Sequence, residues 1–457
     1  MKTIQTVRAL ACTVIVCAGA SDAARAATGD ITLLGQLLPP GMDEICDVWG
    51  YVDPNGVHYA VMGDWGRHLG GGAYIINVED PTNPFLVKAI LHNGSSGFDV
   101  KVWQHYVYTC NGTGSGVTSR VYDITDIQNP VISNPFQGHH NLAIHPDGYL
   151  YGAVPGLMAY DIAADPMVPA FKWLTDVNNG HDSYPVGDML YDFHGYGGTR
   201  IYDISDRLSP VLLGSISDPN ITYHHSGCPT PDGSYLYVCD ELAITPTPDV
   251  TIWNITDPAS PAKVGWFGDA SATIHNLYII GDFAFASYYS AGFRVYGTAN
   301  PAAPALLGTY DTSPSTGENY DGAFGVYPFA DNGVIYVSDW DNGLHLFSVE
   351  GYNPPTAVDG DPPKPANARL VGNYPNPFNP ATTISYELDQ RLRASLSIFD
   401  VRGRLVRTLV EGTEAAGRHD VGWDGLDLAG QRVSSGVYFA RLVVNGRSDT
   451  RRLVLLK

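Results

Sequence analysis

Histidine and aspartate residues recur at matching points of a pattern that repeats along this chain. Both residue types bind metal ions: imidazole nitrogens favour transition metals such as Zn²⁺, and carboxylate oxygens favour Ca²⁺. If their side chains meet at one axis, the sequence predicts a site for a divalent ion, Zn²⁺ or Ca²⁺. The candidate ligands are His140, His181, His225, His275, Asp47, Asp99 and Asp182. The same part of the repeat also contains Asn141, Ser226, Asn276 and Asp321. The neighbouring residues His139 and His224 would add further donor atoms.

A structural role for these polar residues is the alternative. Buried polar groups need hydrogen-bond partners, and side chains at such positions can satisfy the backbone of a neighbouring repeat. A repeat also copies its structural residues along with any functional ones. The sequence contains no nucleophile elbow, no His-Glu-x-x-His motif and no dinucleotide-binding fingerprint. No catalytic residue and no organic cofactor can therefore be assigned.

The repeat itself consists of an apolar strand, an acidic turn with proline, and a second short strand. It reads Val-Tyr-Asp-Ile-Thr-Asp at 121–126 and returns as Ile-Tyr-Asp-Ile-Ser-Asp at 201–206. The acidic or amide turn residues fall at positions 80, 126, 165, 206, 257 and 300, which are 39 to 51 residues apart. Such a side chain can accept a hydrogen bond from the backbone two residues on. A period of about 40–50 residues with four short strands is typical of a β-propeller blade.

Seven second strands indicate seven blades. They are predicted at His58–Gly63, His105–Cys110, Tyr149–Val154, Met189–His194, Tyr235–Asp240, Phe283–Tyr288 and Val334–Asp339. The last repeat, 319–350, lacks a fourth strand after Leu344–Val349. Residues 31–37 carry the Leu-Leu-Gly pattern of the fourth strands at 211–216 and 305–310. We therefore expect an all-β, seven-bladed β-propeller over 31–350, closed by its N-terminal strand, which covers an otherwise open sheet edge.

The first 26 residues have the features of a secretory signal peptide. Lys2 and Arg8 form a basic start, 9–20 is apolar, and Ala24-Arg25-Ala26 is a cleavage pattern. We expect an exported protein, on the outer-membrane surface or extracellular, with no transmembrane helix after cleavage. The net charge is −21, divided into −24 for 1–369 and +3 for 370–457. An acidic propeller repels phosphate, so nucleic acid is not expected as a partner.

Four cysteines remain after cleavage: Cys46, Cys110, Cys228 and Cys239. Export permits disulfides. Cys228 and Cys239 flank a Pro-Asp-Gly turn and could face each other on adjacent strands, if the register allows it. Buried free thiols are the alternative, and the sequence leaves both open.

The order of motifs resembles the choice-of-anchor B family of exported bacterial proteins, and the repeat resembles the LVIVD repeat. The resemblance covers about residues 31–350. It implies a β-propeller at the cell surface and no settled biochemical activity. The matching motifs are Cys46–Tyr51, His140–Ile144, His181-Asp182, Tyr223–His225, Asp240–Leu242, Ile274–Tyr278 and Gly322–Pro328.

A separate C-terminal domain follows a proline-rich linker at 351–369. Short alternating strands over 370–457, such as Thr383–Leu388 and Ala394–Asp400, predict a small Ig-like β-sandwich. This tail resembles the FlgD-type Ig-like domain and the type A sorting domain of type IX secretion. The resemblance implies the type IX secretion machinery as a partner. The alternatives are a permanent adhesive sandwich and a purely stabilising domain.

Three classes of function remain. The first is a surface-displayed binding module for an extracellular protein or glycan. The second is a metal-dependent, hydrolase-like enzyme with its site at the channel mouth. The third is a structural component of an extracellular coat or matrix. Since a fold does not determine a function, the geometry of the candidate site is needed to choose among these three classes.

Overall fold

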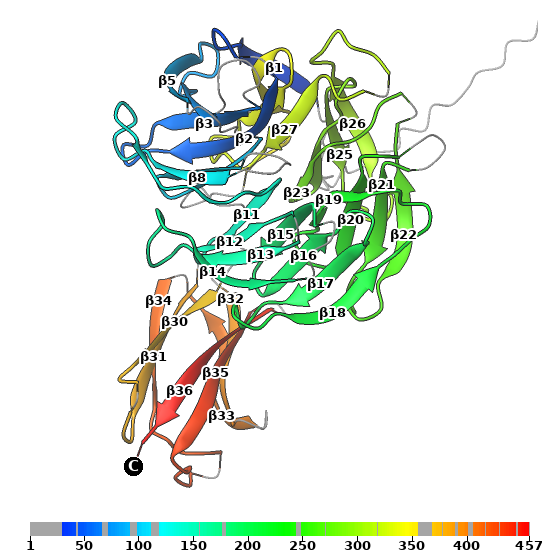
Figure 1. Cartoon of the computed structure of the whole chain (residues 1–457). Helices are drawn as coiled ribbons and strands as arrows, with labels where there is room; N and C mark the ends of the chain where they lie inside the picture. The colour runs from blue at the N-terminus through cyan, green and yellow to red at the C-terminus, as the bar shows by residue number, and fades with distance from the viewer. Residues whose placement is uncertain are drawn as a thin grey trace, which may run out of the picture.

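The computed structural model consists of β-strands and connecting turns, with no helix among the residues it describes (Figure 1). It describes residues 30–456 except 43, 66–71, 92–97, 111–117, 155, 176–179, 244–247, 270, 318, 355–367, 377, 389–391, 401–404, 416, 429 and 445–446. The predicted signal peptide and most of the proline-rich linker lie outside these residues. A search of the described residues finds no helix long and apolar enough to cross a membrane.

Seven antiparallel sheets, described here as blades 1 to 7, follow one another along the chain. Blade 1 contains β2 (Ile45–Val52), β3 (His58–Asp64), β4 (Gly72–Asn77) and β5 (Phe85–Leu91). Blade 2 contains β6 (Asp99–Trp103), β7 (Tyr106–Cys110), β8 (Thr118–Asp123) and the short edge strands β9 (Val131–Ile132) and β10 (Phe136–Gln137). Blade 3 contains β11 (Leu142–His145), β12 (Tyr149–Gly152), β13 (Met158–Asp161) and β14 (Ala170–Leu174).

The remaining blades have the same order of strands. Blade 4 contains β15 (Asp182–Val186), β16 (Met189–Phe193), β17 (Thr199–Asp203) and β18 (Val211–Ile216). Blade 5 contains β19 (His224–Pro229), β20 (Tyr235–Asp240), β21 (Val250–Asn254) and β22 (Ala262–Phe267). Blade 6 contains β23 (Leu277–Ile280), β24 (Phe283–Ser287), β25 (Phe293–Gly297) and β26 (Ala305–Tyr310). Blade 7 contains β27 (Ala323–Tyr327), β28 (Ile335–Asp339), β29 (Gly343–Val349) and β1 (Ile31–Leu37).

The blades form a closed ring. The first strand of each blade contacts the next in the series β2, β6, β11, β15, β19 and β23. Blade 6 contacts β27 through β24, and β27 contacts β2. Blade 1, in blue, therefore lies beside blade 7, in yellow (Figure 1). The seven-bladed propeller predicted from the repeat is confirmed.

The N-terminal strand closes the last blade as predicted. β1 pairs antiparallel with β29, with Ile31 opposite Val349 and Leu33 opposite Phe347. The register shifts between Leu33 and Gly35. A Cβ atom on Gly35 would lie 2.2 Å from the carbonyl oxygen of Pro81 in blade 1. Only glycine therefore allows the turn of the next blade to approach this strand so closely.

The fourth strands of two other blades also have a glycine at the point where the turn of the next blade approaches. A Cβ on Gly214 of β18 would lie 1.9 Å from the Pro258 carbonyl oxygen, and one on Gly265 of β22 would lie 2.2 Å from that of Ala302. In each case the oxygen belongs to the acidic turn of the following blade. β1 thus occupies the same place in blade 7 that β18 and β22 occupy in their own blades.

The acidic turns have the predicted hydrogen bond. The side chains of Asp80, Asp126 and Asp206 each accept a bond of 3.0 Å from the backbone N–H two residues later. The backbone carbonyls of the same residues accept bonds of 3.0 Å from the N–H three residues later. These paired bonds satisfy the backbone where the chain reverses from the third to the fourth strand.

The four described cysteines are buried, and none of them forms a disulfide. Cys228 lies opposite Tyr237, and Cys239 lies opposite Ser226. Because this register separates the two sulfur atoms along the strands, the Cys228–Cys239 disulfide considered above does not form.

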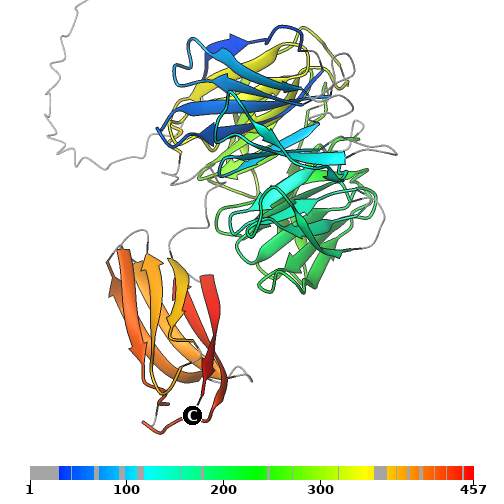
Figure 2. The ribbon, with the colours of Figure 1, turned by 60° about the vertical axis from the view of Figure 1, so that its left-hand side comes forward.

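The C-terminal domain consists of two antiparallel sheets (Figure 2). One contains β30 (Ala368–Tyr374), β31 (Thr382–Leu388) and β34 (Gly417–Trp423). The other contains β33 (Leu405–Glu414), β32 (Leu392–Asp400), β35 (Gly436–Val444) and β36 (Arg447–Leu455). Trp423, Phe378 and Tyr438 pack between the sheets in one apolar core. The predicted β-sandwich is therefore present.

Candidate functional site

Strand direction brings the chemically interesting residues to one face of the propeller. Neighbouring strands of a blade are antiparallel, so the start of the first strand and the loop between the second and third strands lie at the same end. His181 precedes β15, and His225 is the second residue of β19. Glu241 follows β20 directly. We call this end of the propeller the mouth face.

Six aromatic side chains, one from each of blades 2 to 7, form a closed circuit around the channel. We call it the inner ring; its members are Phe98, His140, His181, His225, His275 and Phe324. Consecutive ring centroids are 4.6, 4.5, 4.2, 4.8 and 3.9 Å apart, and 5.7 Å separates Phe324 from Phe98. The four histidines predicted at one register therefore do meet.

Hydrogen bonds between blades fix the tautomer of two of these histidines. His181 Nδ1 lies 3.1 Å from the carbonyl oxygen of His225, and His275 Nδ1 lies 2.7 Å from that of Phe324. A carbonyl oxygen can only accept, so Nδ1 must carry the proton in both rings. The lone pair of each neutral imidazole is consequently on Nε2. These bonds, with that from Ser226 Oγ to the His275 carbonyl at 2.9 Å, perform the structural role considered as the alternative.

Burial keeps the inner-ring histidines uncharged. It lowers the pKa of His225 and of His275 to about 3, and it also lowers the pKa of His140 and of His181. Protonation of one ring would further disfavour charge on its neighbours. At neutral pH the inner ring therefore offers imidazole lone pairs rather than positive charges.

The inner ring encloses a very small cavity. About 10 Å³ is open to the centre of a water-sized sphere, roughly the space that one water molecule needs. Asn141 Oδ1, His140 Nδ1 and His225 Nδ1 are buried without a protein hydrogen-bond partner, and all three residues line this cavity. A single water fits the space and these polar atoms, whereas an organic substrate does not fit.

Asp47 and Asp99 also line the cavity, and both contact a buried lysine that the sequence analysis did not include. Lys101 Nζ lies 2.6 Å from Asp47 Oδ2 and also contacts Asp99 Oδ1. Burial raises the pKa of Asp47 well above its usual value. Burial also acts to raise the pKa of Asp99, but the Lys101 charge and the hydrogen bonds from Asp47, Lys101 and the Leu142 N–H together outweigh it, so that this pKa is lowered. The lysine charge is thus balanced by Asp99. These two predicted metal ligands are engaged by Lys101 in the structure.

Other predicted residues lie apart from the cavity. Asp182 accepts a hydrogen bond of 2.6 Å from the N–H of Ser183, and burial raises its pKa to about 8. Asp321 accepts a bond of 3.0 Å from Ser315 Oγ. His139 and His224 bond Tyr160 and Thr199, at 3.0 and 2.8 Å, within the sheets. None of these four residues lines the inner-ring cavity.

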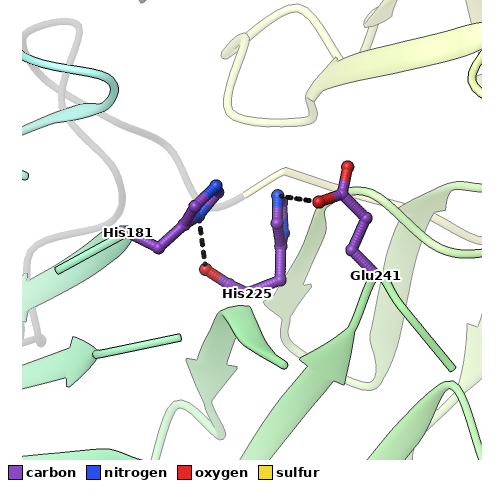
Figure 3. Close-up of side chains that lie close together, drawn as sticks. All are labelled: His181, His225 and Glu241. Atoms are coloured by element: carbon purple, nitrogen blue, oxygen red, sulfur yellow. Dashed lines mark hydrogen bonds and ion pairs between the residues drawn. The ribbon is translucent and has the colours of Figure 1, made fainter. Parts of the chain in front are cut away.

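A carboxylate that the sequence analysis did not select joins two of the histidines. Donor atoms of His181, His225 and Glu241 all lie within 4.8 Å of one another (Figure 3). Glu241 Oε2 is 3.4 Å from His225 Nε2, and Glu241 Oε1 accepts a hydrogen bond of 2.5 Å from Tyr289. Among the described residues, no other group of three or more such side chains could hold a metal ion.

A second set of aromatic side chains lies outside the inner ring, on blades 1 and 4 to 7. We call it the collar; its members are Trp65, Tyr196, Tyr223, Tyr289, Tyr320 and Trp340. Tyr223 packs edge-on against His181 and Trp65 edge-on against Phe98, both at 5.2 Å, and Tyr289 packs at a tilt against His275 at 5.1 Å. Tyr196 and Tyr320 are 68% and 51% exposed. The collar therefore connects the buried inner ring to the surface of the mouth face.

Comparisons with known proteins identify the tail and the fold. Residues 378–447 match the family described as the FlgD Ig-like domain. The comparison with curated proteins finds no match. Among solved structures, "Structure of U3-55K" is similar, with a TM-score of 0.50, 10% identity, and coverage of 70% of this chain and 98% of that one. "Crystal structure of RRP9 WD40 repeats" has a TM-score of 0.49, 10% identity and the same coverage of both chains.

These findings define the chain as a β-propeller followed by a FlgD Ig-like domain. At 10% identity, the likeness to the U3-55K structure concerns the fold alone. The resemblance to the choice-of-anchor B family and the LVIVD repeat stays a prediction from the sequence. The metal site, the export signal and the sorting role also stay predictions.

Proposed function

We propose that the protein is an exported binding module that holds an extracellular protein or glycan on the mouth face of its propeller. The observation that carries this proposal is the collar. Its exposed members, Tyr196 and Tyr320, pack edge-on against Tyr223 and Tyr289 at 4.9 and 5.1 Å. These partners contact the inner ring, so the exposed rings are held in place. Ordered tyrosine and tryptophan side chains are the residues that most often dominate binding interfaces.

The closed channel favours binding over catalysis. The inner-ring cavity is about 10 Å³, so a ligand must rest on the mouth face instead of entering it. Glu241 contacts the collar residue Tyr289, and residues 1–369, which include the propeller, carry a net charge of −24. An acidic, aromatic surface suits a partner that presents basic or hydroxyl groups.

The tail has a separate role in this proposal. The sandwich of β30–β36 is the sorting address that the type IX secretion machinery reads, after the predicted signal peptide has directed the chain out of the cytoplasm. Support comes from the FlgD Ig-like match at 378–447 and from the resemblance of this tail to type A sorting domains. The tail's charge of +3, opposite to the rest of the chain, agrees with a part that contacts different partners.

Tyr196→Ala and Tyr320→Ala test the binding role. The purified protein is titrated against a panel of soluble oligosaccharides and of proteins from the medium of the producing cells. For any ligand bound by the wild type, each variant should weaken binding by about tenfold or more, because an anchoring ring is lost.

Leu208→Ala is the matched control, since Leu208 is 60% exposed but lies in the acidic turn of blade 4, at the opposite end of the blade. Equal affinity in the two tyrosine variants and the wild type would refute the mouth face as the binding surface. All three variants should melt at the wild-type temperature.

A further inference from the structure

The mouth face also brings together three side chains whose nitrogen and oxygen atoms can bind a metal ion. We propose that His181, His225 and Glu241 bind one transition-metal ion of the Zn²⁺ type. Two neighbouring blades supply the imidazoles, and the loop after β20 supplies the carboxylate (Figure 3). The proposal stands independently of the partner proposed above.

The spacing of the donors matches a metal site better than a hydrogen bond. His225 Nε2 and Glu241 Oε2 are 3.4 Å apart, whereas N–H···O bonds have lengths of about 2.7–3.2 Å. Two ligands at about 2.0–2.1 Å from a tetrahedral Zn²⁺ lie about 3.4 Å from each other. The third donor, on His181, lies within 4.8 Å of both, and on metal binding it would have to move closer to the other two by rotation about its side-chain bonds.

The available lone pairs also point to a metal ion. His181 donates its Nδ1–H to a backbone carbonyl at 3.1 Å, which leaves Nε2 as an acceptor. Metal-bound histidines commonly donate their other ring N–H in this way. His225 Nδ1 has no protein partner and its residue lines the water-sized cavity, so Nδ1–H can donate a hydrogen bond to a water there while Nε2 faces Glu241.

Tyr289 orients the carboxylate. Its hydroxyl donates to Glu241 Oε1 at 2.5 Å, and this leaves Oε2 facing His225. Tyr289 is buried and has a positive φ of 31°, a backbone conformation that a residue with a side chain rarely adopts. Such strain is retained where the surrounding structure requires it. The hydroxyl of this strained residue is the group that bonds Glu241.

The donor set selects the class of metal. Two imidazole nitrogens and one carboxylate suit Zn²⁺ or Co²⁺, whereas Ca²⁺ needs six to eight oxygen donors. Asp47 and Asp99 cannot supply those oxygens, because Lys101 engages both. Three protein ligands leave the fourth position of a tetrahedral ion open, and the nearby collar residues Tyr223 and Tyr289 would border it.

Metal titration of the full chain tests the proposal. After chelator treatment, the wild type should bind one Zn²⁺ by calorimetry, and one Co²⁺ with the intense visible absorption of a four-coordinate ion. Glu241→Gln and His225→Gln should remove this binding, and Tyr289→Phe should weaken it about tenfold. Circular dichroism melting confirms that each variant is folded.

The C-terminal domain supplies a matched control. His419 Nδ1 lies 3.5 Å from Glu414 Oε2, a His–Glu pair of nearly the same spacing without a second histidine beside it. His419→Gln and Glu414→Gln should leave the stoichiometry and affinity unchanged. The proposal is overturned if the wild type binds no stoichiometric metal, or if Glu241→Gln and His225→Gln bind it as tightly as the wild type does.

Discussion

At the scale of single residues, the channel contains uncharged histidines and one buried positive charge, that of Lys101, which a carboxylate neutralises. Burial favours the neutral form of every inner-ring imidazole. Lys101 is charged and buried, and it lies 4.8 Å from the centre of the Trp49 ring with Asp99 as its counter-ion. An unpaired charge at this depth would cost several kcal/mol, so Lys101, Asp47 and Asp99 have to be considered as one group.

His345 in β29 allows the effect of histidine burial to be measured outside the inner ring. Burial lowers its pKa to about 4, below the value near 6.5 of an unfolded chain. Between these values the unfolded state binds a proton that the folded state does not, so the residue destabilises the fold as the pH falls. Relative to the wild type, His345→Gln should gain about 1.4 kcal/mol in free energy of unfolding per pH unit from about 6.5 down to about 4.

Urea unfolding of both proteins at pH 7.5, 6.5, 5.5 and 4.5 checks this difference. It should be constant above pH 6.5 and change only below it. If the difference has no pH dependence, the imidazole is charged in the folded protein and its assigned burial is wrong.

The sequence located the histidines of the site but not all of their partners. The repeat predicts the register of His140, His181, His225 and His275, because each begins a blade in the same way. Lys101 could have been found: it lies two residues after Asp99 on one strand and must face the same side. The repeat did not select Glu241, because loops carry no periodicity; the only signal for it was its place in the motif Asp240–Leu242 of the family resemblance.

At the scale of elements, glycine decides how closely the blades pack. Gly35, Gly214 and Gly265 each lie against a backbone carbonyl of the next blade. The Leu-Leu-Gly pattern is therefore a packing requirement, and for this reason it identified β1 as a fourth strand.

Gly35→Ala tests the closure of the ring. The added Cβ would lie 2.2 Å from the Pro81 oxygen, and such overpacking typically costs about 1–3 kcal/mol. The melting temperature of the propeller should fall, and deletion of residues 31–37 should abolish its cooperative transition. Calorimetry of the full chain measures both.

Gly422→Ala in β34 is the control, since a Cβ there meets nothing within 4 Å. The melting temperature of this variant should equal that of the wild type. Closure by β1 would be refuted if the shortened chain melted cooperatively at the wild-type temperature.

Strand positions were predictable where the alternation of side chains is regular. The observed second strands lie within two residues of the predicted ones. The outer edge of blade 2 was not predicted, because Pro135 interrupts it between β9 and β10. Proline has no N–H for the ladder. Ser133 fills the gap: its hydroxyl and its N–H bond the N–H and carbonyl of Val121, each at 2.9 Å.

At the scale of the whole molecule, an acidic propeller is joined to a mildly basic sandwich. The division of charge and the separate apolar core of the tail indicate that the two parts fold independently. Removal of the tail should therefore leave the propeller intact, which makes the sorting role testable in isolation.

Deletion of residues 370–457 should abolish delivery to the cell surface while the propeller still folds. Cell-surface labelling and fractionation of the producing cells measure delivery, and protease resistance of the retained protein measures folding. Normal surface delivery of the truncated protein would exclude the tail as a sorting address.

The pairing of β1 with β29 joins residues that are almost as far apart in the chain as the propeller allows, since Ile31 meets Val349. A loop of this length closes slowly. Synthesis must consequently proceed through every blade before the circle can be completed, and until then two strand edges are exposed to other chains. Ring closure is therefore a late step in folding. The same step covers the strand edges through which copies of the chain could aggregate.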